Sequence, residues 1–438
     1  MNFCVSLFCK SWCVFKVFFL FIGVILCWYE IGGQFGSFSI FTKFYLLSVI
    51  MFLPRNSMSP INVLMGYYGL WFVLSPMFGL TYNDEMLKSY EYEVAIAMAF
   101  STYSICLLSL LFGEFMSKKI KLSASPKNIF SINNRYIQVL YFLASSMIIL
   151  IVMKSGGFSV WINNPGDAFL NRGGTGVYVI LSHFFSIALA ASVGLNSFNK
   201  KNITYLLIFI TWLIITSPVH GSKFQISLLF LIAIIPWFRK MKTKSSVTLL
   251  MGLTLACIFF IGMHFRGFDL TNMDGFSHVL GYFSTLHNLA LSIRDYEPGG
   301  LFTFFLPFNK FLTPFGLGGG VSYYDMNHLL TDIYYPEAWE IRATEQWPVE
   351  TDLYLNFYFF GGFPLIIIYM ASVGLLYGFS QKSSYLGLGI VSLLTSLSMI
   401  SHLRGSLYNH TDFYIVPFML IYLYLFRNVK CLTQNTKI

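Results

Sequence analysis

Charged residues are scarce in this 438-residue chain: they make up 11% of it, whereas 56% of the residues are hydrophobic and 19% are aromatic. Soluble domains carry roughly a quarter charged residues, so this composition excludes a water-soluble globule. No polar block is long enough to fold separately. We therefore predict a single membrane domain over residues 1–438.

The sequence also lacks the signatures of several common classes of enzyme. It has no glycine-rich phosphate loop, no CxxC pair and no His-Glu-x-x-His motif. Their absence argues against ATP-driven transport and against a zinc hydrolase of the familiar type. Seven cysteines are present, but none falls in a segment that we place on the outer side of the membrane, so no structural disulfide is expected.

Long apolar runs, in contrast, recur along the whole chain. A spanning helix needs about 20 mostly apolar residues. The first run follows Lys10 and Lys16 as in a signal peptide, but no small-x-small cleavage site comes after it, so we keep it as a spanning helix. The sequence predicts an all-α polytopic membrane protein of about twelve transmembrane helices. The predicted spans are Cys13–Tyr29, Phe38–Leu53, Ile61–Leu80, Val94–Phe112, Tyr136–Met153, Gly176–Leu195, Ile203–Thr216, Phe224–Phe238, Val247–Met263, Leu353–Leu376, Tyr385–Ile400 and Phe413–Phe426.

The placement of the charges predicts the orientation of these spans. With the N-terminus inside, the internal segments hold 17 of the 28 Lys and Arg residues, and Glu114 is the one internal carboxylate of 19. This bias follows the positive-inside rule. It predicts an inner-membrane protein with both termini in the cytoplasm, and it explains the net charge of +9 without nucleic-acid binding.

The longest predicted external segment runs from His264 to Asp352, between the ninth and tenth spans. Its length and its aromatic stretches indicate short interfacial or re-entrant helices. Within it, Phe276–Arg294 has helical spacing, with Phe283, Leu286 and Leu289 on roughly one side. Such a helix either lies on the membrane surface or packs against the bundle.

Basic and imidazole side chains gather at the predicted external ends of the helices, against the internal bias of Lys and Arg. Several cations that face one cavity suit a phosphorylated lipid, because the guanidinium fork binds phosphate oxygens in a bidentate way. Any single one can equally be an Arg or Lys that snorkels to headgroups, or a His that packs. The residues are Arg172, His220, Lys223, His264, Arg266, Arg294, His402 and Arg404.

A polar stretch with two carboxylates, Glu350 and Asp352, leads into the tenth span, which carries Asn356 and the pair Gly361-Gly362. Asp352 can act as a base or orient a sugar hydroxyl. It can also be a helix cap, because acidic residues are favoured at helix N-termini.

Four short stretches resemble the O-antigen and capsule repeat-unit polymerases, integral membrane enzymes that join lipid-linked oligosaccharides on the outer side of the bacterial inner membrane. The family often has Arg at the position of Lys223 and Phe-Gly at Phe357-Tyr358, so the chain departs from its pattern there. The stretches are Ser155-Gly156-Gly157 leading to Asn171-Arg172-Gly173-Gly174, then Gly221-Ser222-Lys223, Glu350 to Gly362, and the turn Arg404-Gly405-Ser406.

The resemblance implies a metal-independent, cofactor-free glycosyltransferase of lipopolysaccharide or capsule biosynthesis. Its donor and acceptor would be undecaprenyl-diphosphate-linked oligosaccharide repeat units, and a chain-length regulator and a flippase would be its protein partners. Departure of the diphosphate develops negative charge, which fixed cations must meet when no metal is bound. For substrate binding it implies Arg266, Arg404 and Lys223, followed by Arg172, Arg294 and Asn356. The candidates for the base that accepts the hydroxyl proton are His220, His264, His402 and Asp352.

Other functions stay open at this stage. A lipid-linked oligosaccharide flippase or another secondary transporter can also have about twelve spans, although transporters usually place ionisable groups near mid-membrane and have related halves. A ligase that transfers finished glycan to another acceptor would have nearly the same sequence features. A non-catalytic assembly scaffold would leave the external cations without a purpose.

Overall fold

The computed structural model describes residues 2–33, 36–54, 56, 59–77, 89–120, 134–164, 168, 174–220, 223–238, 283, 285–312, 323–340, 344–382 and 386–408. Over these residues the chain is all-helical and contains no strand, as the sequence predicts. The chain divides into two compact units. Unit 1 comprises Met1–Ser117, Asn272–Leu375 and Ser398–His410, and unit 2 comprises Lys118–Thr271, Leu376–Leu397 and Thr411–Ile438.

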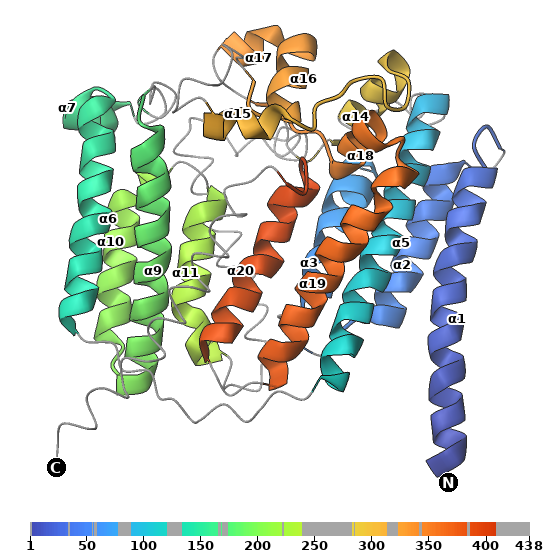
Figure 1. Cartoon of the computed structure of the whole chain (residues 1–438), viewed down its shortest axis with the longest axis horizontal. Coiled ribbons are helices and arrows are strands. Elements are labelled where there is room, and N and C mark those ends of the chain that lie inside the picture. Colours follow the sequence, from blue (N-terminus) through green and yellow to red (C-terminus); the bar gives the residue numbers. More distant parts are fainter. Residues whose placement is uncertain are drawn as a thin grey trace. The chain divides into compact units, whose positions relative to one another are not determined.

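Figure 1 labels most helices of each unit. Unit 2 contains α6 (Asn134–Lys154), α7 (Gly157–Asn163), α9 (Gly176–Lys200), α10 (Thr204–His220) and α11 (Lys223–Phe238). Unit 1 contains α1 (Asn2–Tyr29), α2 (Ser37–Phe52), α3 (Pro60–Tyr68), η1 (Gly69–Leu74), α4 (Ser75–Met77), nearly all of α5 (Tyr90–Lys119), α14 (Thr285–Asp295), α15 (Leu306–Leu312), α16 (Met326–Tyr334), α17 (Pro336–Glu340), α18 (Val349–Phe357), η4 (Phe360–Gly362), α19 (Phe363–Lys382) as far as Leu375, and α20 (Leu386–Leu403) from Ser398.

Four of the described helices are long and apolar enough to cross a membrane: Tyr90–Lys119, Asn134–Lys154, Gly176–Phe198 and Phe360–Lys382. Five shorter apolar helices are Val14–Tyr29, Ser37–Phe52, Thr204–His220, Gln225–Trp237 and Leu388–Leu403. These helices coincide with predicted spans, and their composition is that of a membrane protein. The predicted spans Val247–Met263 and Phe413–Phe426 lie outside the described residues, so the count of twelve stays a prediction.

Local sequence explains where several helices begin. Ser59 precedes α3 and accepts a hydrogen bond from the backbone N–H of Ile61, and Pro60 occupies the first turn, where its missing N–H costs nothing. In α5, Glu91 and Glu93 lie in the first turn and Lys118 and Lys119 in the last. Both pairs of charges complement the helix dipole.

Close packing between membrane helices depends on small residues. In unit 1 a Cβ atom added at Gly374 of α19 would lie 2.2 Å from the carbonyl oxygen of Leu110 in α5, and one added at Gly113 would lie 2.0 Å from that of Ala371. In unit 2 a Cβ at Gly194 of α9 would lie 2.5 Å from the carbonyl oxygen of Ala233 in α11. Glycine at these positions lets the backbones approach, which is how helices commonly associate in lipid.

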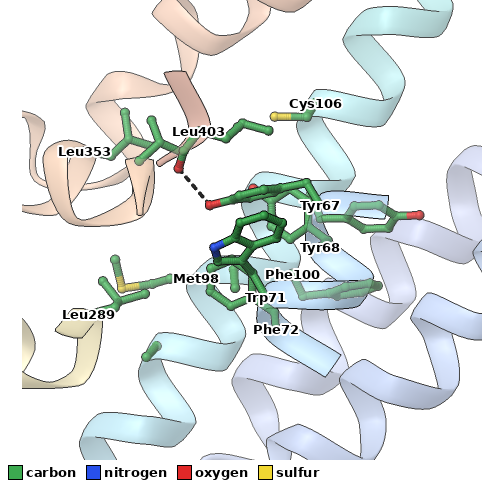
Figure 2. Close-up of a cluster of buried hydrophobic side chains, with 14 of the residues drawn as sticks. Tyr67, Tyr68, Trp71, Phe72, Met98, Phe100, Cys106, Leu289, Leu353 and Leu403 are labelled. Carbon is green, nitrogen blue, oxygen red and sulfur yellow. Dashed lines mark hydrogen bonds between the residues drawn. The ribbon is translucent and has the colours of Figure 1, made fainter. Parts of the chain in front are cut away.

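The core of unit 1 is aromatic, and Figure 2 shows its centre. Tyr67 and Trp71 stack at 4.8 Å between ring centroids, and the Tyr67 hydroxyl donates a 2.8 Å hydrogen bond to the backbone carbonyl of Leu403. A π-helical turn, η1, follows Tyr68 directly. Such turns are rare and recur at functional sites.

The predicted external segment contains short helices, α14 to α18, which lie near the end of unit 1 where α19 begins (Figure 1). Leu286 and Leu289 of α14 are fully buried in the core of unit 1, so packing against the bundle is the correct interpretation for the described part of Phe276–Arg294.

The predicted span Leu353–Leu376 differs from the structure at its start. Residues 353–357 belong to the separate helix α18, and the apolar helix begins only at Phe360. Tyr358 and Phe359 have positive φ angles of 52° and 63°, which break the helix between α18 and η4. Hydropathy did not reveal this break because every residue around it is apolar or uncharged.

Candidate functional site

The predicted site residues fall into three groups. Arg172, His264 and Arg266 lie outside the described residues, and only the backbone of Lys223 is described, as the first residue of α11. His220 belongs to unit 2. Five lie in unit 1: Arg294, Asp352, Asn356, His402 and Arg404.

Asp352 is the centre of a buried hydrogen-bonded cluster. Its Oδ1 atom accepts hydrogen bonds from Ser406 Oγ at 3.0 Å, Tyr408 Oη at 2.6 Å and Asn356 Nδ2 at 2.9 Å. The first two donors follow α20, so the carboxyl group ties that segment to α18. Burial raises the pKa of Asp352 to about 7, against the effect of the three hydrogen bonds.

Asn356, one turn further along α18, holds the loop that precedes α15. Its Oδ1 accepts the backbone N–H groups of Thr303 at 2.7 Å and Phe304 at 3.0 Å. Its Nδ2 donates to Thr303 Oγ1, to Asp352 Oδ1 and to the backbone carbonyl of Asp352. Both the oxygen and the nitrogen of the Asn356 amide therefore have partners within the protein. Its contact with substrate stays a prediction.

Glu350 is a second buried carboxyl group on α18. Its Oε1 accepts a 2.7 Å hydrogen bond from the hydroxyl of Tyr68, next to the turn η1. Burial raises the pKa of Glu350 to about 7, and its hydrogen bonds, the one from Tyr68 first, oppose that rise. A carboxyl group with a pKa near neutrality can take up or release a proton at working pH.

Arg404 lies in the turn after α20 and is fixed from three sides. Its Nε donates to Gln346 Oε1, and its guanidinium carbon lies 5.4 Å from the centroid of the Trp71 ring, a cation–π arrangement. Its backbone carbonyl accepts a 3.1 Å hydrogen bond from Asn327 Nδ2. The backbone of Arg404 belongs to the same turn as Ser406, a ligand of Asp352, whereas its guanidinium contacts Gln346 and Trp71.

His402, in the last turn of α20, is buried, and its Nδ1 lies 2.5 Å from the hydroxyl of Tyr369 on α19. Arg294 differs, because it is exposed and makes a forked pair with the adjacent Asp295 at 2.8 Å and 3.0 Å. The hydrogen bond from Arg294 lowers the pKa of Asp295.

In unit 2, His220 ends α10. Its Nε2 lies 3.1 Å from Thr216 Oγ1, one turn earlier on the same helix, and its ring meets Trp212 edge to face at 5.8 Å. The nearby predicted motif Ser155-Gly156-Gly157 forms the turn between α6 and α7. Both of its glycines have positive φ, and Ser155 Oγ accepts from the indole of Trp161.

Five residues with notable contacts were not predicted as site residues: Ser406 and Tyr408, which bind Asp352, Gln346, which binds Arg404, and the hydrogen-bonded pair Glu350 and Tyr68. Ser406 has a sequence signal, since it belongs to the Arg404-Gly405-Ser406 turn. Glu350 also has one, since it begins the stretch Glu350 to Gly362. Its contact with Tyr68 has no sequence signal, because the two residues are 282 residues apart in the chain. Within the described residues no group of three or more His, Cys, Asp or Glu side chains could hold a metal ion.

The fold and site together are those of a helical protein with membrane-type helices and a buried carboxyl group that accepts hydrogen bonds from an amide and two hydroxyl groups. The chain matches no protein-family model, no curated protein and no solved structure.

Proposed function

We propose that this protein is a membrane glycosyltransferase that polymerises undecaprenyl-diphosphate-linked oligosaccharide repeat units on the outer face of the bacterial inner membrane. Its product would be O-antigen or capsule. The proposal includes the twelve-span topology, with both termini in the cytoplasm and residues 264–352 outside.

One observation carries the proposal: a buried carboxyl group with a pKa of about 7 is hydrogen-bonded to the same short turn, residues 404–406, that carries a cation. Asp352 binds Ser406, and Ser406 follows Arg404 by two residues. Glycosyl transfer needs these two functions, a base for the acceptor hydroxyl and a positive charge for the departing diphosphate. Arg404 suits the second role because a guanidinium binds phosphate oxygens in a fork.

Metal-independent chemistry follows from the same assignment. If Arg404, with Arg266, Lys223, Arg172 and Arg294, meets the charge of the diphosphate, no Mg²⁺ is required. Activity that chelation abolishes and Mg²⁺ or Mn²⁺ restores would refute this part of the proposal.

The test of the function is deletion of the gene in its host, with the surface glycan examined on a gel. A polymerase predicts that glycan of a single repeat unit persists while longer chains disappear. Complete loss of surface glycan would contradict the proposal and favour a flippase or a ligase.

The topology has its own test. Glu337 of α17 is exposed and belongs to the proposed external segment, whereas Lys242 belongs to a proposed internal loop. In a cysteine-free variant, Glu337→Cys will react with an impermeant maleimide on intact spheroplasts and Lys242→Cys will not. Equal labelling, or labelling at Lys242 alone, would contradict the twelve-span arrangement.

A further inference from the structure

The loop before α15 has an unusual composition for a segment proposed to face water. The loop and the first residues of α15, from Pro298 to Asn309, contain no charged residue and include four phenylalanines. The surface of a soluble loop would carry charges or small polar residues. The composition of this segment therefore differs from that of a loop that is exposed to water.

Buried hydrogen bonds fix this loop on α18. Asn356 binds the backbone N–H groups of Thr303 and Phe304, and the N–H of Gly299 donates to the carbonyl of Tyr354 at 2.9 Å. Thr303 itself is buried. These hydrogen bonds fix the backbone of the loop, and the fixed backbone determines the direction of the neighbouring side chains.

The held backbone turns aromatic rings outward instead of burying them. Phe302, Phe305 and Phe308 are exposed, and so are Tyr358 and Phe360 at the start of the apolar helix; we call these five side chains the aromatic patch. Their exposed fractions run from 47% to 71%. Tyr358 takes its position through a positive φ, with its ring against Gly299, where a Cβ atom would lie 2.7 Å from the ring.

The surroundings of the patch indicate what covers it. Phe360 begins the apolar helix Phe360–Lys382, and its ring lies 5.8 Å from that of Trp28, which with Tyr29 ends the apolar helix Val14–Tyr29. Trp and Tyr at the ends of apolar helices are typical of the boundary between membrane and water. The exposed face continues along α19 through Ile368. The patch is therefore continuous with side chains that a bilayer would cover.

We propose that the aromatic patch enters the interfacial layer of the lipid bilayer, among headgroups and the first acyl carbons. Each ring then leaves water without needing a protein partner, and the burial of its apolar area stabilises the contact with lipid. A surface patch of this kind that stayed in water would be an aggregation hazard.

This contact would also set the depth of the Asp352 cluster. Phe304 links the patch and the cluster, with its ring 5.4 Å from that of Phe305 and 4.7 Å from that of Tyr408. The patch thus places the buried carboxyl group near the level of lipid headgroups. The inference concerns lipid contact alone and does not depend on the proposed enzymatic activity.

The experiment replaces Phe305 by p-benzoylphenylalanine in the otherwise unchanged full chain. The protein is reconstituted in vesicles of phosphatidylethanolamine and phosphatidylglycerol with a radiolabelled acyl chain, and it is then irradiated. Position 305 will form several-fold more lipid adduct than the matched control at Glu337 of α17, a charged residue that is likewise exposed. Position 302 serves as the second test site, and gel filtration before irradiation checks that each variant is folded.

Lipid adduct at positions 305 and 302 equal to that at position 337 would overturn the proposal. Adduct to a second copy of the chain in place of lipid would also overturn it, and would assign the patch to protein association.

Discussion

Replacement of Asp352 by alanine will destabilise unit 1, because the buried carboxyl group is the shared acceptor of three donors, two of them on buried residues and the third on the partly buried Tyr408. Asn356 keeps other partners after the change, whereas Ser406 and Tyr408 lose this acceptor. A buried donor without a partner costs about 1–3 kcal/mol, so the two together cost roughly 2–6 kcal/mol. Relief from burying a carboxyl group with a raised pKa offsets part of this cost. We expect a net loss of about 2–4 kcal/mol.

The matched control is Asp352→Asn, whose carbonyl oxygen can still accept from Ser406 and Tyr408. We expect this variant to keep a thermal stability near that of the wild type, measured as the folded fraction that survives heating in detergent by gel filtration. Its polymerising activity separates two roles: loss of activity in a stable Asn variant identifies a base, and retained activity identifies a positioning residue. An alanine variant as stable as the wild type would refute the reasoning from the hydrogen bonds.

Three further predictions concern pH, packing and charge. Burial raises the pKa of Asp352 from 3.8 to about 7, so between these pH values the folded chain binds more protons than the unfolded chain. The thermal stability of the wild type relative to Asp352→Asn will therefore increase as pH falls from 7 towards 3.8. A difference in stability that stays constant with pH would contradict this prediction. Gly374→Val will lower thermal stability, since overpacking costs about 1–3 kcal/mol, whereas Ser372→Val on the exposed side of α19 will not. Arg404→Lys will lower polymerisation by about a hundred- to thousand-fold at normal membrane abundance, because the guanidinium fork is lost, whereas the exposed control Arg135→Lys will leave polymer length unchanged.

The helices could be predicted well because insertion into a membrane depends on the local composition of the chain. Runs of apolar residues and the placement of Lys and Arg depend only on neighbours in the chain, and each predicted span within the described residues falls on a helix. The tenth predicted span is an exception. Tyr358 and Phe359 break the tenth span through their backbone conformation, and hydropathy does not report φ angles.

The candidate site could be predicted only in part, because its contacts join distant segments. Asp352 and Arg404 were found through short motifs, but their contacts with Tyr408 and Gln346 span 56 and 58 residues of chain. Such pairings depend on how helices pack, which no local pattern encodes. The burial of Glu350 against Tyr68 has the same origin.

The most direct measurement of the central claim uses the purified full chain in vesicles, with undecaprenyl-diphosphate-linked repeat units from its host as the sole sugar substrate. The account predicts a ladder of lipid-linked oligomers, release of undecaprenyl diphosphate with each bond formed, and loss of both products in Arg404→Lys. Folded wild-type protein that gives no oligomers from this substrate, or an Arg404→Lys variant that gives the same ladder as the wild type, would contradict it.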